Sequence, residues 1–311
     1  MLQAYTSEIV GESASSAEIH DFIRREAKGS APVLLLGEAG TGKELVARSI
    51  HFGSARRNSP FLMIDCSLHY ESELERELFG YRPAPGEPAE AARRGLLEFS
   101  PRGSCYAANV EELSPSIQAR ILNLLDTGYL EPVGGDRPTP SRVRLIFSSE
   151  KNLEGLTAGG LFLPELYRRF AGHAAHLRAL RERAEDIGPL VRHFLVRFAT
   201  ERGGPDQELD VSAEALEALA SYPWPGNVDE LKAEVGRLVR AGHRRVVPEV
   251  LTRAMLNHWH GRCEDPQIVR VLDEIEAHIR EFRVMGRLDA QYGDVLLDVA
   301  DWDVLFKSYE R

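Results

Sequence analysis

The feature that most constrains this chain is a glycine-rich loop placed between a short apolar run and a helical stretch. The apolar run, residues 32–36, has the length and composition of a buried strand. The loop that follows it reads Gly37-Glu38-Ala39-Gly40-Thr41-Gly42-Lys43. A strand, a glycine loop and a helix in this order bind phosphate, because backbone N–H groups and the helix N-terminus surround the anion while the lysine supplies a positive charge. The sequence therefore predicts a nucleotide-phosphate loop.

Strands and helices alternate through the first part of the chain. We expect strands at 33–36, 61–65, 104–110 and 143–148, and helices to about residue 51 after the loop and at 71–79 and 116–126. Near the start, Ser15 and Glu18 have the spacing of a capping box, and Ile19, Phe22 and Ile23 then share one helical face. This alternation predicts an α/β fold with a mainly parallel sheet.

Helical patterns follow from about residue 186, near 186–201, 212–221 and 227–241, and predict a small all-helical lid. Residues 262–311 carry two further amphipathic patterns, which predict a helical hairpin. The hairpin either docks on its own domain or a copy of it, or binds a protein partner. We expect an α/β nucleotide-binding domain over 1–178, the lid over 179–260 and the C-terminal helical segment over 261–311.

Bulk properties exclude several classes of protein. A formal net charge of -10 over 311 residues argues against a nucleic-acid-binding surface, so DNA binding is not expected. The three cysteines, Cys66, Cys105 and Cys263, lack metal-ligand spacing and are expected to be reduced thiols. No apolar run approaches the roughly 18 residues of a membrane span, so a cytoplasmic protein with no membrane contact is expected.

An ordered set of motifs resembles the AAA+ domain of bacterial enhancer-binding proteins, the sigma-54 activators. The matching segments are Ile9–Ser13 (IVGES), Gly37–Val46 (GEAGTGKELV), Glu77–Gly80 (ELFG), Leu180–Ile187 (LRERAEDI) and Tyr222–Val228 (YPWPGNV). The resemblance covers about residues 9–247. It implies a P-loop α/β domain with a helical lid, ring-type oligomers and ATP-driven remodelling of sigma-54 RNA polymerase. It also adds Glu44, which the family usually has after the loop lysine, to the expected ATP or ADP site.

The chain departs from this family where the chemistry is expected. The family's Asp-Glu pair, which holds Mg²⁺ and the attacking water, falls on Ala108 and Asn109, and its sensor asparagine falls on Glu150. Rescue by Glu111 or Glu112 is not expected, since each lies three residues beyond the position it would replace, roughly 10 Å along a strand and on its opposite face.

Further departures affect the surroundings of the phosphates. The family's switch asparagine falls on Asp65, and its lid arginine falls on Asp229. Of the two arginines that reach a neighbouring subunit, one falls on Leu163, while the other is retained as Arg169, a candidate contact in trans.

The loop by which the family touches sigma-54 is also altered. Residues 81–94 contain no aromatic–threonine tip, so direct contact with sigma-54 is doubtful. The histidines His173 and His176 have no cysteine or carboxylate cluster beside them and are expected to be structural or exposed rather than metal ligands. Arginines 178, 181 and 183 interleave with acidic residues and are expected to form ion pairs.

Two hypotheses remain open. The favoured one is a catalytically degenerate AAA+ module with no catalytic residues and no protein metal site, which binds ATP or ADP with weak or absent Mg²⁺. Such a module would act as a regulatory or scaffolding protein toward protein partners, either copies of itself or related AAA+ subunits. The alternative is an active ATP-hydrolysing, sigma-54-dependent transcription activator whose missing acids come from another position.

Overall fold

The computed structural model describes residues 9–83, 92–135, 137–201, 210–241 and 245–251. The chain divides into two compact units, Met1–Glu182 and Arg183–Arg311, which are considered separately below. The hairpin predicted for 262–311 lies outside the described residues.

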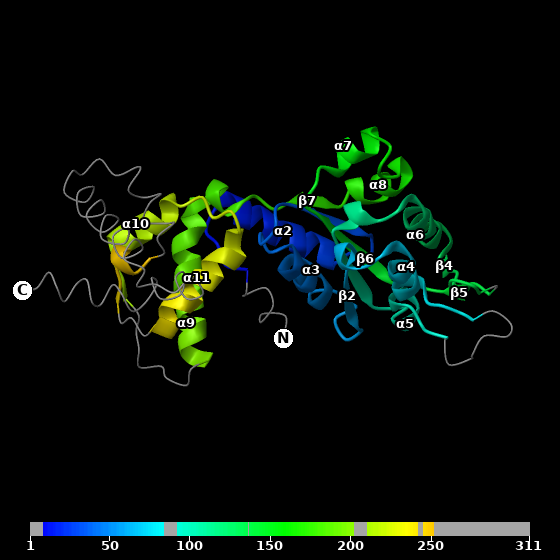
Figure 1. Cartoon of the computed structure of the whole chain (residues 1–311), viewed down its shortest axis with the longest axis horizontal. Coiled ribbons are helices and arrows are strands. Elements are labelled where there is room, and N and C mark those ends of the chain that lie inside the picture. The colour runs from blue at the N-terminus through cyan, green and yellow to red at the C-terminus, as the bar shows by residue number, and fades with distance from the viewer. Residues whose placement is uncertain (1–8, 84–91, 136, 202–209, 242–244, 252–311) are drawn as a thin grey trace, which may run out of the picture. The chain divides into compact units, whose positions relative to one another are not determined.

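The first unit is built on a parallel sheet whose strands run in the order β2-β3-β6-β1-β7 (Figure 1). Its strands are β1 (Val33–Leu36), β2 (Phe61–Asp65), β3 (Ser104–Ala108), β6 (Arg144–Ser149) and β7 (Ala174–His176). All neighbouring pairs are parallel, which confirms the predicted fold class. A short antiparallel pair, β4 (Tyr129–Leu130) with β5 (Thr139–Pro140), stands apart from this sheet.

Helices cover both faces of the sheet, as a buried parallel sheet requires. They are α2 (Ala14–Ala27), α3 (Lys43–Phe52), α4 (Glu71–Phe79), α5 (Leu96–Phe99), α6 (Pro115–Thr127), α7 (Leu153–Ala158) and α8 (Pro164–Ala171). Strand β1 shows how the two faces are filled: Val33 and Leu35 pack with α2 and α3, whereas Leu34 packs with α4, α6 and α8. This alternation with a period of two follows from strand geometry.

The first helix begins earlier than the sequence pattern suggested. Ser13 is the N-cap of α2, and its hydroxyl accepts a hydrogen bond from the backbone N–H of Ser16 at 3.1 Å. The prediction that Ser15 caps this helix is therefore wrong, because Ser13 satisfies the first-turn N–H groups two residues before it. The predicted apolar face is confirmed, since Ile19, Phe22 and Ile23 are all buried.

The second unit has the three predicted helices, α9 (Ile187–Glu201), α10 (Ala213–Ser221) and α11 (Asn227–Ala241). It also contains a short parallel pair, β8 (Asp210–Val211) with β9 (Arg245–Val246), which the sequence pattern did not reveal. Trp224, fully buried between α10 and α11, donates its indole N–H to the carbonyl of Leu219 at 2.8 Å. The Tyr222–Val228 motif thus forms the turn that packs these two helices together.

The described cysteines behave as small buried hydrophobic residues. Cys66 and Cys105 are free thiols, and burial raises the pKa of each to about 12. Such thiols remain protonated and unreactive at neutral pH. Cys263 lies outside the described residues. Among the helices that the structure describes, none is long and apolar enough to cross a membrane.

A buried histidine, His51, connects α3 to the start of β3 and makes the stability of the protein depend on pH. His51 is fully buried, with Nδ1 2.9 Å from Ser104 Oγ and Nε2 3.1 Å from the carbonyl of Ser59. Burial lowers the pKa of His51 from 6.5, and the positive charges of Arg56 and Arg144 lower it further. The unfolded chain therefore binds more protons than the folded one below about pH 6.5, so stability falls as the pH drops through this window.

We expect His51→Gln to flatten that part of the stability profile. The measurement is the free energy of unfolding by urea at several pH values between 7 and 5, for the wild type and the variant. The difference between the two profiles isolates His51 from the other histidines. If the free energies of unfolding of the two proteins changed with pH in parallel, His51 would not be the source of this pH dependence.

Candidate functional site

The glycine loop lies at the carboxyl end of β1, where β1 ends at Leu36 and α3 begins at Lys43. Gly42 is the N-cap of α3 in the left-handed region, with φ of 99°. Gly37 is required by space, because a Cβ there would lie 2.6 Å from the carbonyl oxygen of Leu177. A glycine loop that leads from a strand into a helix N-terminus is the arrangement that binds phosphate.

Lys43 lies folded over this loop and is largely buried. Its Nζ donates to the carbonyl oxygens of Gly37 and Glu38 at 2.7 and 2.8 Å. The same Nζ lies 3.6 Å from Oε1 of Glu150, which immediately follows β6. The structure thus brings the loop lysine and the position of the family's sensor residue together, and pairs the lysine with a carboxylate of its own chain.

The end of β3 lacks acidic side chains at the positions where the resemblance expects them. Ala108 is the last residue of β3, paired in register with Asp65 of β2, and Asn109 follows it in the left-handed region with φ of 55°. Asn109 Nδ2 donates to Asp65 Oδ1 at 2.9 Å. Ser67 also donates to this oxygen, through its hydroxyl at 2.7 Å and its backbone N–H at 3.0 Å. The side chain at the second acidic position therefore serves to hold Asp65.

Asp65 is correspondingly stabilised in its ionised form. Partial burial alone would raise its pKa, but the hydrogen bonds from Ser67 and Asn109 outweigh burial and hold the pKa of the Asp65 carboxyl below its ordinary value. A permanent negative charge therefore lies at the carboxyl end of β2, where the resemblance expects a neutral asparagine.

The strand prediction for 104–110 is wrong at its carboxyl end. The strand stops at Ala108, and Val110–Glu112 form a 3-10 turn. The physical reason is the left-handed backbone of Asn109, a conformation that asparagine adopts more readily than most residues and that reverses the chain direction.

This turn also corrects the prediction that Glu111 points away from the site. Glu111 Oε1 accepts a hydrogen bond from the backbone N–H of Glu150 at 3.2 Å, so Glu111 turns back toward the end of β6. The offset argument failed because it assumed an extended chain. The signal available in the sequence was the asparagine itself, since asparagine adopts the left-handed conformation more readily than most residues. Glu112 instead pairs with Lys151 at 2.7 Å.

Other charged side chains around the loop also form ion pairs. Arg181 donates to both carboxylate oxygens of Glu38, one of them at 2.8 Å, and Glu44 pairs with Arg48 at 2.7 Å. The sequence predicted an ion pair for Arg181 but not its partner, which lies 143 positions away. In the second unit, Arg183 lies 3.9 Å from Asp186, as expected for this acidic and basic stretch.

The other predicted residues lie on separate elements. Arg169, on α8, pairs with Asp126 of α6 and is about half exposed. Leu163 is the N-cap of α8, and its N–H donates to Gln118 Oε1 at 2.7 Å. Asp229 is exposed in the first turn of α11, in the second unit.

The described ends of the altered loop, residues 81–83 and 92–94, are joined by a bridge between Tyr81 and Arg93, while residues 84–91 lie outside the described part of the chain.

The two histidines near β7 have different surroundings. His173 Nδ1 lies 2.9 Å from Oε2 of the buried Glu26, and His176 is exposed at the end of β7. Within the described residues, no group of three or more His, Cys, Asp or Glu side chains is arranged to hold a metal ion.

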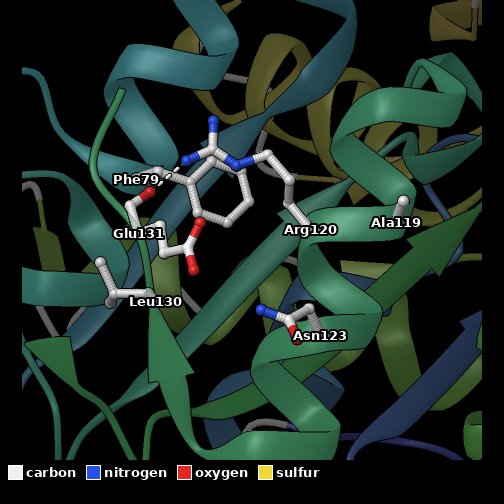
Figure 2. A pocket seen from close by; sticks show the side chains of 6 residues that line it. All are labelled: Phe79, Ala119, Arg120, Asn123, Leu130 and Glu131. Carbon is white, nitrogen blue, oxygen red and sulfur yellow. Dashed lines mark hydrogen bonds between the residues drawn. The ribbon is translucent and has the colours of Figure 1, made fainter. Parts of the chain in front are cut away.

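A small hollow of about 180 Å³ lies between α4, α6 and the loop after β4, and Figure 2 shows its lining. The Arg120 guanidinium lies 4.2 Å from the centre of the Phe79 ring and donates to the carbonyl of Glu131 (Figure 2). It also donates to Glu75 at 2.5 Å. The Arg120 guanidinium in this hollow is thus engaged by its own chain, and we assign the hollow a structural role.

These residues fit a nucleotide phosphate but not a protein-bound magnesium ion. The loop supplies N–H donors and a lysine, which suit a phosphate oxygen. Mg²⁺ prefers carboxylate oxygens in octahedral geometry, whereas Ala108 has no side-chain oxygen and Asn109, whose amide nitrogen donates to Asp65, has no carboxylate. We therefore derive no catalytic step through a metal ion at this site.

Comparison with known proteins agrees with this architecture. Residues 9–175 match the sigma-54 interaction domain, and residues 181–261 match the AAA+ ATPase lid domain. The chain is 38% identical over 231 residues to a Nif-specific regulatory protein of Azospirillum lipoferum, covering 74% of this chain and 36% of that protein. It is 40% identical over 228 residues to the transcriptional regulatory protein XylR of Pseudomonas putida, covering 73% of this chain and 40% of that protein. It is 35% identical to a Nif-specific regulatory protein of Rhizobium leguminosarum bv. trifolii, covering 86% of this chain and 74% of that protein.

Solved structures show the same likeness. NtrX from Brucella abortus in complex with ADP has a TM-score of 0.72 and 29% identity, covering 89% of this chain and 62% of that one. The complex of NtrX with ATP has a TM-score of 0.71 and 28% identity, covering 92% of this chain and 67% of that one. The chain spans only between about a third and two fifths of the length of the first relatives named above. By the extent of the domain match and by these identities, the chain belongs to the sigma-54 interaction domain family of AAA+ proteins.

Proposed function

We propose that this chain is a catalytically degenerate member of the family that binds ATP or ADP without hydrolysing it and acts as a regulatory or scaffolding protein. One observation carries the proposal: β3 ends in Ala108 and Asn109, and the Asn109 side chain is bonded to Asp65. The phosphate loop keeps its binding groups, while the neighbouring strand lacks the two acids that would serve the chemistry.

Nucleotide binding is supported by the geometry of the loop and by the related solved structures. Gly42 leaves open space at the N-terminus of α3, and the Lys43 side chain is folded over the loop. NtrX, which shares the fold and over a quarter of the sequence, has been solved with ADP and with ATP. We extend nucleotide binding to this chain on these two grounds.

The absence of turnover follows from the demands of phosphoryl transfer. The reaction depends on positioning the attacking water and on stabilising negative charge around the transferred group. Ala108 cannot hold a metal ion, and Asn109 cannot take a proton from water. Glu150 adds a negative charge 3.6 Å from the lysine that should stabilise the phosphates. We therefore expect turnover at least about a thousandfold below the roughly 10 s⁻¹ of a typical enzyme.

A protein with this site would act through its partners. We propose assembly with copies of itself or with related AAA+ subunits, to which Arg169 would offer a guanidinium after leaving Asp126. Residues 81–94 lack the aromatic–threonine tip of the family, so direct contact with sigma-54 is not proposed. The net charge of -10 likewise favours protein partners over DNA.

The second candidate is an active ATPase and transcription activator, and one observation favours it. Glu111 turns back to the end of β6 and bonds to the backbone of Glu150, whose carboxylate lies beside Lys43. A carboxylate is thus closer to the phosphate loop than the sequence indicated. In this case Glu111 would orient the attacking water, and Glu111→Gln would abolish turnover.

The two candidates are separated by phosphate release from ATP and Mg²⁺, measured on the pure full chain. The first candidate predicts that the wild type releases no more phosphate than Lys43→Ala. Turnover that both Lys43→Ala and Glu111→Gln abolish would overturn it and support the second candidate. Parallel measurements of nucleotide binding show whether each variant still holds its ligand.

Restoring the two acids is expected to produce little turnover. In Ala108→Asp with Asn109→Glu, the new glutamate replaces the amide that donates to Asp65, so two carboxylates face each other and Glu150 remains beside Lys43. Like charges at this distance disfavour ionisation of both groups. Phosphate release by the double variant is the measurement, with Ala108→Asn as the neutral control. Turnover at several per second would show that the rest of the site is intact.

A further inference from the structure

The residue that distinguishes this phosphate loop is the carboxylate placed against its lysine. Glu150 follows the last residue of β6, and β6 is the direct neighbour of β1, with Leu36 opposite Ser149. Its side chain is 43% exposed, whereas that of Lys43 is only 9% exposed. The carboxylate therefore reaches from solvent toward a lysine that its own loop has already enclosed.

The position of Glu150 is fixed by its neighbours. Its backbone N–H donates to Glu111, and the adjoining Ser149 hydroxyl lies 3.1 Å from both the N–H and the carbonyl oxygen of Lys151. Burial raises the pKa of Tyr106 to about 12, and the negative charges of Glu44, Asp65 and Glu150 contribute to the rise.

The cations around the loop are already matched by carboxylates. The pairs are Lys43 with Glu150, Arg181 with Glu38, Arg48 with Glu44 and Lys151 with Glu112. A nucleotide brings about one additional negative charge with its third phosphate, and a neutralised site offers little to compensate it.

We propose that Glu150 makes this site selective for nucleoside diphosphates over nucleoside triphosphates. The inference rests on the proposed nucleotide binding. A P-loop lysine reaches the β- and γ-phosphates of a bound nucleotide. A carboxylate already paired with that lysine therefore repels the γ-phosphate most strongly, while the loop N–H groups still hold the α- and β-phosphates. The chain would then sense ADP rather than use ATP.

The test is to titrate the pure full chain with ADP and with a non-hydrolysable ATP analogue, by calorimetry in the presence of EDTA. We expect the wild type to bind ADP at least about tenfold more tightly than the analogue, a difference of about 1.4 kcal/mol. Glu150→Gln removes the charge and keeps the shape, so it should bring the ratio of the two Kd values close to one. The factor is limited to about tenfold because water screens a half-exposed carboxylate.

Two controls make the result specific. Glu154→Gln removes an equally charged and exposed side chain on α7 and should leave the ratio unchanged. Glu150→Ala gives a second neutral variant should the glutamine variant not fold, and thermal melting checks each protein. If wild type binds both nucleotides equally, or if neither neutral variant changes the ratio, the selectivity proposal is overturned while nucleotide binding stands. If the wild type binds neither nucleotide, the proposed nucleotide binding is itself overturned, and the selectivity with it.

Discussion

Replacing Lys43 by alanine is expected to weaken ADP binding about hundredfold, equivalent to about 2.7 kcal/mol. Lys43 Nζ lies against the loop, where it donates to the carbonyl oxygens of Gly37 and Glu38 at 2.7 and 2.8 Å. A hydrogen bond to a charged group contributes about 1.5–3 kcal/mol, and the variant loses both that bond and the charge opposite the phosphates. The measurement is the Kd of ADP for both proteins.

Lys28→Ala is the matched control, because it removes an exposed lysine at the end of α2 and should not change the Kd. Lys43→Met retains the apolar stem without the charge, so it separates the loss of charge from the loss of packing. An unchanged Kd in Lys43→Ala would mean that ADP binds elsewhere on the chain.

Replacing Trp224 by alanine is expected to destabilise the second unit by about 3–5 kcal/mol. The side chain is fully buried, its indole N–H bonds to the carbonyl of Leu219, and its ring lies 5.1 Å from that of Tyr222. The cavity left by an indole is too large for α9, α10 and α11 to close by small shifts. The measurement is urea unfolding followed by circular dichroism.

Trp224→Phe is the graded control for that experiment. It keeps an aromatic ring but removes the N–H donor, leaving the Leu219 carbonyl without this partner, so a smaller loss of about 1–3 kcal/mol is expected. Equal stability of the alanine variant and the wild type would contradict the role assigned to this turn.

The fold was largely predictable because its elements are marked by local chemistry. Strand β2 and helix α4 have the bounds that were expected, since Pro60 precedes the strand and Gly80 follows the helix. The lid helices follow their apolar periodicity in the same way. The pair β8 with β9 was missed because two residues carry no periodic signal.

The candidate site was predictable in its residues but not in its geometry. The loop sequence predicted the phosphate site, and the family resemblance implied the loss of the acids at Ala108 and Asn109. Neither revealed that Asn109 would adopt a left-handed conformation, which ends β3 and turns Glu111 back to Glu150. Nor does any local pattern connect Glu38 with Arg181 or Lys43 with Glu150, because the fold alone brings these distant positions together.

A nucleoside triphosphate bound at the loop is expected to be held and not cleaved, and a single-turnover experiment tests this most directly. The full chain is placed in excess over ATP labelled at the γ-phosphate, with Mg²⁺ present, so that weak affinity does not limit the reaction. We expect the label to stay in ATP and the wild type to release no more labelled phosphate than Lys43→Ala. Release of one labelled phosphate per bound ATP, lost in Lys43→Ala, would contradict it.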